Sequence, residues 1–463
     1  MERKNAWAAY AGDDGKVEAF AKAYCDFINN GKTERECVAY GEKLAKAHGF
    51  EDLNAVVRSG RKLNAGARVY ANWMGKSFML FVLGEKPLEE GMNILGAHID
   101  SPRIDVKQNP LYEDTDLAYL DTHYYGGIKK YQWVAIPLAL HGVIVRKTGE
   151  KVIINIGEDE NDPVFCISDL LVHLAQEQMA KNAKEVVEGE ALNLIVGGRP
   201  LEGEEKDAVK ANVLKLLADK YGVEEEDFLS AELEIVPAGK ARDMGFDRSM
   251  ILGYGHDDRV CAYPSMMAVL DYEGTPDYTL CCIVTDKEEI GSVGATGMAS
   301  HYLENTVAEL YACTADYCDL SVRRCLRNSR MLSSDVSAGY DPNFASAFEK
   351  KNSAFLGRGI CFNKFTGSRG KSGSNDANPE FMASLRKIMD DAGVAFQTAE
   401  LGRVDLGGGG TIAYLCAKYG MNVIDSGIPV LSMHAPYEII SKVDLYEGYR
   451  GYCAFLQGAK PVE

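Results

Sequence analysis

Histidines and carboxylates occur in five short stretches of this chain, each close behind an apolar run that is typical of a buried β-strand. The stretches are His98 and Asp100 in GAHIDSPR, Asp257 and Asp258 in GYGHDDRVCAY, Glu288 and Glu289 in DKEEIGS, Asp335 in LSSDVSAG, and His434 in PVLSMHAPYE. In open α/β sheets, ligands bind beyond the carboxyl ends of the strands, so residues that follow buried strands can converge on one crevice. We therefore expect these side chains to form one polar site.

Convergence of so many carboxylates predicts bound cations, because like charges in one crevice repel each other unless they are neutralised. Histidine, Asp and Glu ligands together suit Zn²⁺, and Mn²⁺ or Co²⁺ are alternative occupants. The number of candidate ligands favours two metal ions with a bridging carboxylate, and one further carboxylate to take a proton from the water between them. Taken singly, each stretch also fits a structural role, such as a core histidine, solvated surface charge or a helix cap.

The elements that would position these residues change character twice along the chain. Residues 1 to about 85 predict helices followed by strands, and from about residue 235 strands and helices alternate, as in an open α/β sheet with helices on its faces. Residues 106–234 predict a separate module with β-hairpins in 126–157, a helix over 169–183, and a final helix and strand. The expected organisation is one domain formed by 1–105 and 235–463, interrupted by an inserted domain at 106–234.

Composition excludes several classes of protein. The formal net charge of −18 repels phosphate backbones, so nucleic acid is not expected as a partner. No apolar run reaches the roughly 18 to 20 residues of a membrane span, and no secretion signal is visible, so we expect a soluble, cytoplasmic protein whose 12 cysteines are inert thiols. The glycine run Gly407–Gly410 lacks the spacing of a phosphate-binding loop.

The five motifs, in this order and over nearly the whole chain, resemble the aspartyl aminopeptidase and aminopeptidase I family of dinuclear zinc exopeptidases. The resemblance implies an α/β fold with a zinc-exopeptidase-like mixed sheet, helices on both faces, and an inserted, mainly-β dimerisation domain. It further implies a metalloaminopeptidase that acts on peptides, assembled as a homododecamer built from dimers.

The resemblance also assigns a role to each site residue, with two Zn²⁺ per subunit. Asp257 resembles the bridging ligand, followed by a cis peptide bond to Asp258. His98 and Asp335 resemble the terminal ligands of one zinc. Glu289 and His434 resemble those of the other. Glu288 resembles the general base, and Asp100 the carboxylate that holds His98 or tunes the nearby metal. His173 best matches a histidine that reaches a neighbouring subunit's site, with His123 as a rival.

The adjacent carboxylates Glu288 and Glu289 would then have separate tasks. We expect an extended backbone at this point, in which successive side chains alternate in direction. Glu289 can therefore face a metal ion while Glu288 faces the water between the metals.

Specificity is where the chain departs from the family pattern. Members that prefer acidic amino-terminal residues place a lysine in the strand that corresponds to GRGICFNK, and the matching residue here is Cys361, with Lys364 and Arg369 close by. We therefore expect a preference for neutral or hydrophobic amino-terminal residues. The alternatives are an acidic-residue-specific aspartyl aminopeptidase, a zinc carboxypeptidase or deacylase of the same clan, and a non-enzymatic scaffold, against which the intact metal set and Glu288 argue.

Overall fold

The computed structural model describes residues 4–367 and 369–462. The chain forms two compact units. The first contains the chain up to Asp100, Ala241–Met433, and the chain from Glu438 onward; the second contains Ser101–Lys240 together with His434–Tyr437. The predicted insertion at 106–234 falls within the second unit.

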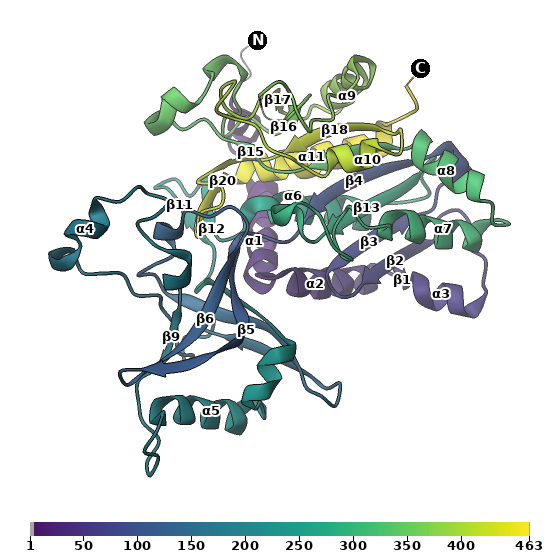
Figure 1. The fold of residues 1–463 in the computed structure, drawn as a ribbon. Helices are drawn as coiled ribbons and strands as arrows, with labels where there is room; N and C mark the ends of the chain where they lie inside the picture. Colours follow the sequence, from purple (N-terminus) through teal and green to yellow (C-terminus); the bar gives the residue numbers. More distant parts are fainter. Residues whose placement is uncertain (1–3, 368, 463) are drawn as a thin grey trace. The chain divides into compact units, whose positions relative to one another are not determined.

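The first unit is built on a nine-stranded mixed sheet (Figure 1). In spatial order its strands are β1 (Glu51–Asp52), β2 (Arg68–Trp73), β3 (Ser77–Val82), β13 (Thr279–Thr285), β4 (Met92–His98), β14 (Arg330–Ser334), β18 (Asn422–Gly427), β16 (Ile360–Asn363) and β17 (Phe396–Thr398). The central strands β13, β4, β14 and β18 run parallel to one another. The predicted α/β fold with a mixed sheet is confirmed.

Helices cover both faces of this sheet because its strands bury side chains in both directions. Along β3, Phe78, Leu80 and Val82 belong to one core, while Met79 and Phe81 belong to the other. Helices packed on the first core are α1 (Gly15–Asn30), α2 (Glu34–Ala47), α6 (His256–Leu270), α9 (Pro379–Asp391) and α11 (Lys442–Gly458). Helices packed on the second core are α3 (Leu53–Ser59), α7 (Tyr302–Thr314), α8 (Asp319–Asn328) and α10 (Ala413–Ala417).

A smaller five-stranded sheet completes the first unit. Its strands, in spatial order, are β11 (Arg242–Met244), β12 (Met250–Gly253), β20 (Glu438–Ser441), β19 (Pro429–Leu431) and β15 (Ser337–Ala338). Strand β12 leads directly into α6, and β20 leads directly into α11. This sheet therefore fixes where both of these helices begin.

The second unit is mainly β, as predicted. Its antiparallel sheet has the order β8 (Lys151–Ile156), β7 (Leu138–Val145), β10 (Ala231–Pro237), β5 (Arg103–Asp114), β6 (Leu117–Tyr125) and β9 (Leu194–Gly197), with helix α5 (Ala208–Tyr221) alongside. The predicted hairpin with its turn at Thr148-Gly149 is β7–β8. The hairpin β5–β6 was not predicted, because β5 is largely polar, contains Pro110 and shifts register between Val106 and Leu111.

The predicted helix over 169–183 is wrong. The structure has a 3₁₀ turn at Val172–Leu174 and a four-residue helix, α4 (Gln176–Met179). The apolar side chains that suggested a helix are exposed, with Val172 77% and Met179 72% accessible. Most helical stability in proteins comes from packing an apolar face, and this segment packs little of it within the chain.

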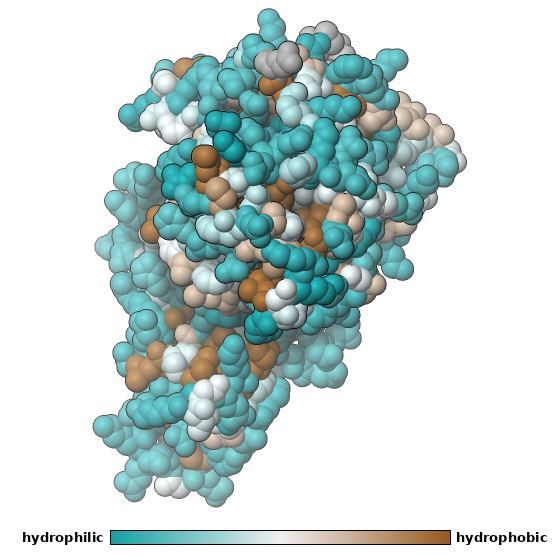
Figure 2. All heavy atoms as spheres, turned by 90° about the vertical axis from the view of Figure 1, so that its right-hand side faces the viewer, coloured by the Kyte–Doolittle hydropathy of each residue, from teal (hydrophilic) through white to brown (hydrophobic). Residues whose placement is uncertain are grey.

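On the face drawn in Figure 2, hydrophilic side chains predominate and apolar ones are interspersed among them. Of the helices in the described ranges, none combines the length and the apolar character that crossing a bilayer requires.

Candidate metal centre

Three neighbouring parallel strands of the large sheet bring candidate ligands to one edge. His98 is the last residue of β4 and lies opposite Thr285, the last residue of β13. Glu288 and Glu289 follow β13 in a turn of 3₁₀ helix, and Asp335 follows β14 directly. The convergence predicted from strand ends is therefore found for these four residues.

Asp257 and Asp258 enter the same place from the start of α6. Their backbone angles are not helical, and the peptide bond between them is cis, as the resemblance implied. Asp258 Oδ2 accepts a hydrogen bond from the His98 amide at 3.4 Å, and Glu438 Oε2 accepts one from the Asp257 amide at 3.0 Å. Sequence reasoning missed Glu438: it ends the MHAPYE motif, but only the fold shows that it holds the Asp257 backbone.

The side chains form a tight cluster around His98. Its Nε2 atom lies 3.2 Å from Asp257 Oδ1 and 3.9 Å from Asp335 Oδ1. Three overlapping sets each have their potential ligand atoms within 4.8 Å of one another: His98, Asp257 and Glu289; His98, Glu288 and Asp335; and Asp257, Asp258 and Asp335. Enough potential ligand atoms for more than one metal ion therefore lie in a small, largely buried volume.

Asp100 connects the histidine to the glutamate turn. It is completely buried, and its Oδ1 and Oδ2 atoms accept hydrogen bonds from the amides of Glu288 and Glu289, each at 3.1 Å. Its Oδ1 also lies 3.3 Å from His98 Nδ1, and its backbone carbonyl lies 3.0 Å from the same nitrogen. Asp100 therefore holds His98, as predicted, and also fixes the backbone of both glutamates.

The electrostatics of the cluster reflect crowded negative charge. Burial, followed by the charge of Asp335, raises the pKa of Glu288 to about 8, although His98 opposes the shift. Burial also raises the pKa of Asp258 well above its usual value. For His98, burial alone would lower the pKa, but the carboxylates of Asp100, Asp257 and Asp335 outweigh burial and raise it.

These side chains fit zinc. The His98 Nδ1 atom faces a backbone carbonyl, which leaves Nε2 toward the carboxylates, and a ligating histidine usually has its second nitrogen held in this way. One imidazole nitrogen with several carboxylate oxygens is a donor set that Zn²⁺ accepts. Dications among these carboxylates would also offset the repulsion that raises their pKa values.

His434 belongs to the second unit, so the structure does not add it to this cluster. Its Nδ1 atom lies 2.9 Å from the carbonyl oxygen of Gly127. This is the same arrangement as at His98. The role of His434 as a metal ligand stays a prediction.

The remaining candidates belong to other elements of the chain. In the second unit, His173 is exposed within its 3₁₀ turn, and His123 is exposed on β6 with its ring stacked on Tyr124. Cys361 is completely buried in β16, and burial raises the pKa of its thiol to about 12. Just beyond the glycine run, Thr411 Oγ1 donates to Asp425 Oδ1 at 2.5 Å, which anchors that run beside β18.

Comparison with known proteins identifies the family. The model of the family "Aminopeptidase I zinc metalloprotease (M18)" matches residues 27–456. A protein of Clostridium acetobutylicum described as a probable M18 family aminopeptidase 1 is 58% identical over 459 residues, which is 98% of each chain. The crystal structure of an M18 aminopeptidase from Thermotoga maritima has a TM-score of 0.94 and 43% identity, covering 99% of this chain and 100% of that one. The crystal structure of aminopeptidase I from Clostridium acetobutylicum has a TM-score of 0.92 and 56% identity, covering 98% of this chain and 99% of that one. The chain therefore belongs to the aminopeptidase I (M18) family of zinc metalloproteases and is a zinc-dependent aminopeptidase.

Proposed function

We propose that this aminopeptidase works with two zinc ions per subunit and removes neutral or hydrophobic amino-terminal residues from peptides. The observation that carries the proposal is the overlap of the ligand sets, in which His98, Asp257 and Asp335 each belong to two groups. Of the two shared carboxylates, Asp257 is the one that the resemblance assigns to the bridge. A carboxylate shared between groups is suited to bridging two ions, with His98 and Asp335 on one side and Glu289 and His434 on the other. Zinc at this position would supply an acidified water and polarise the scissile carbonyl.

Glu288 is the proposed general base. Its carboxylate lies with those of the cluster, and its backbone is fixed by Asp100. It would take the proton of the attacking water and return it to the leaving amine. A buried carboxylate whose pKa is raised takes up a proton more readily than a solvated one, which suits the first of these steps.

The substrate preference is argued from charge. At the position where acid-preferring members have a lysine, this chain has the uncharged, buried Cys361. The nearby Lys364 is ion-paired with Asp376, which also pairs with Lys371. Because one carboxylate serves two lysines here, the neutral preference is inferred from the uncharged, buried Cys361.

Assembly is proposed as a homododecamer built from dimers, with His173 reaching a neighbouring subunit's site. The mApe1 structure from S. cerevisiae is a dodecamer and shares this fold at 22% identity, with a TM-score of 0.75 and coverage of 95% of this chain. The exposed apolar residues around His173 are consistent with a contact between subunits. We also propose a cytoplasmic location, as expected from the sequence.

The test is a zinc-reconstituted assay over a panel of amino-acid p-nitroanilides, with EDTA-treated enzyme as the control. We expect leucyl and related substrates to be hydrolysed faster than aspartyl ones, and chelation to abolish turnover. Hydrolysis of N-acylated amino acids alone would favour the deacylase alternative. The variant Glu288→Gln should keep its zinc and its assembly while losing most activity; unchanged turnover would show that Glu288 is not the base.

A further inference from the structure

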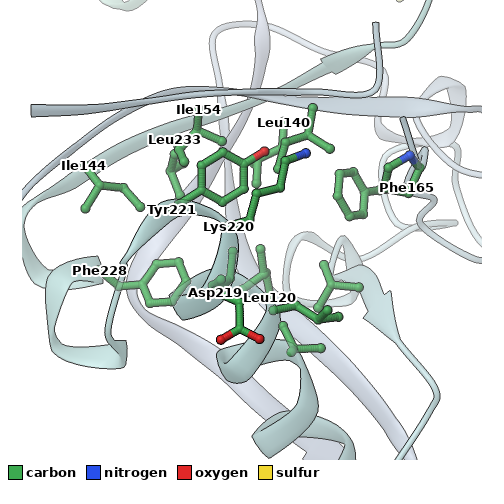
Figure 3. Close-up of a pocket in the computed structure, with 16 residues that line it drawn as sticks. Leu120, Leu140, Ile144, Ile154, Phe165, Asp219, Lys220, Tyr221, Phe228 and Leu233 are labelled. Atoms are coloured by element: carbon green, nitrogen blue, oxygen red, sulfur yellow. The ribbon is translucent and has the colours of Figure 1, made fainter. Parts of the chain in front are cut away.

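A cavity in the second unit lies between helix α5 and the sheet (Figure 3). Its volume is about 470 Å³. Strand residues such as Leu140, Ile154 and Leu233 form its floor, and Val213 and Leu217 of α5 face it from the other side. Its size falls within the range of about 300 to 1,000 Å³ that is typical of small-molecule sites.

Helix α5 leaves this space open because it packs loosely. Only Val209 is buried among its 14 residues, and Leu216 is 59% exposed. Protein interiors are normally close-packed, with few voids larger than a water molecule, whose share of liquid volume is roughly 30 Å³. Water in an apolar cavity finds few hydrogen-bond partners, so an apolar molecule would stabilise the cavity more than water does.

The charged groups of the cavity lie together near the end of α5. The Asp219 carboxylate is ion-paired with Lys215, and Figure 3 shows it pointing away from the Lys220 ammonium and the Tyr221 hydroxyl. Within the described ranges, Lys220 makes no ion pair with a carboxylate. The pKa of Lys220 is raised mainly by its hydrogen bond with the Tyr221 side chain and also by the charge of Asp162. The Asp162 carboxylate accepts a hydrogen bond from the Gly157 amide.

We propose that this cavity binds a medium-chain fatty acid, with its alkyl chain against the sheet and its carboxylate on Lys220 and Tyr221. The lining explains each part of this choice. Away from α5 the walls are apolar, mostly aliphatic with Phe165 and Phe228 among them, which suits an alkyl chain. A single cation beside a hydroxyl suits a single carboxylate. This site is separate from peptide hydrolysis and uses only residues of the second unit.

The test is isothermal titration of the full-length, zinc-loaded protein with hexanoate, octanoate and decanoate, each compared with the 1-alkanol of the same length. Affinity should rise about fourfold for each added methylene. The variant Lys220→Met should weaken decanoate binding by about two- to fivefold, the worth of an ion pair at an exposed lysine, and should leave decanol binding unchanged. As a matched control, Lys184→Met removes an exposed lysine outside the cavity and should change neither ligand.

A second variant tests the place of the alkyl chain. Val213→Phe should fill the cavity and weaken the acid and the alcohol alike, with circular dichroism to show that the chain is folded. The proposal is overturned if the wild-type protein binds none of the acids. That result is expected if a second copy of the chain fills the cavity and excludes the ligand. Equal losses in Lys220→Met and Lys184→Met, or equal losses for acid and alcohol in Lys220→Met, would also overturn it.

Discussion

Replacing Asp100 with Asn tests whether this residue positions the catalytic glutamates. The two side chains have nearly the same shape, but Asn offers one acceptor oxygen where Asp offers two. In the structure each carboxylate oxygen accepts one amide, from Glu288 or from Glu289, at 3.1 Å. In Asp100→Asn one of these amides must face an NH₂ group, so the turn that carries both glutamates has to shift.

The size of the effect follows from these contacts. A hydrogen bond to a charged group contributes about 1.5 to 3 kcal/mol, and one buried amide also loses its acceptor, so we expect the free energy of unfolding to fall by about 2 to 4 kcal/mol. A displacement of about 1 Å at a reacting group can lower kcat by about 10²-fold. Loss of the carboxylate that faces His98 should also weaken zinc binding by about 10- to 100-fold.

The assay compares kcat, zinc content and urea unfolding at saturating zinc. The matched control is Asp444→Asn, because Asp444 is equally buried and accepts the amides of Gly357 and Gly359, at 2.6 Å each, in the loop before β16. We expect both variants to lose stability but only Asp100→Asn to lose kcat. A kcat for Asp100→Asn within about threefold of wild type, at full zinc occupancy, would refute the positioning role.

Three further predictions follow from the charges of the first unit. Zinc binding at pH 7 should release protons, because dications favour the deprotonated forms of Glu288, whose pKa is about 8 without metal, and of His98, whose pKa is also raised. Calorimetry in buffers of different ionisation enthalpy measures this release. It should be smaller in Glu288→Gln, and also in wild type above about pH 9. EDTA should lower Tm and added zinc should restore it, since zinc binds the folded state preferentially; an unchanged Tm would contradict a metal site among these carboxylates. Lys76→Met should lower the free energy of unfolding by about 3 to 5 kcal/mol in urea titrations, because Lys76 lies 2.7 Å from Glu34 and 3.6 Å from Asp286, both completely buried. Lys46→Met, which removes an exposed lysine from its pair with Glu42, should lower it far less.

The sequence was sufficient to predict the α/β class and the grouping of His98, Asp257, Glu289 and Asp335. For His98, Glu289 and Asp335 the reason is that apolar strands are easy to recognise and parallel strands end at a common edge. Asp257 instead follows β12 of the smaller sheet, at the start of α6. The contacts that hold the ligands in place were harder to predict from the sequence. The bond from Glu438 to the Asp257 amide depends on where β20 ends relative to α6, and no local pattern encodes that distance.

Tertiary context also explains the failure at residues 169–183. The spacing of Leu170, Leu171 and Leu174 predicts an amphipathic helix only if a surface within the chain receives the apolar face. In the structure all three side chains are exposed, so the backbone follows local turns instead. A pattern of hydrophobic residues thus reports a buried face without saying which chain buries it.

The backbone at Glu288 and Glu289 differs from the one expected from the sequence. We expected an extended backbone, but the segment Glu288–Ile290 forms a turn of 3₁₀ helix between Lys287 and Gly291, which both have positive φ angles. A 3₁₀ helix has about three residues per turn, so neighbouring side chains still diverge widely. Glu289 joins the set with His98 and Asp257, whereas Glu288 joins the set with His98 and Asp335. A turn also lets one carboxylate, Asp100, accept both consecutive amides, which an extended strand would direct to opposite sides. The 3₁₀ turn therefore separates the two glutamate side chains and at the same time fixes them to a single buried support.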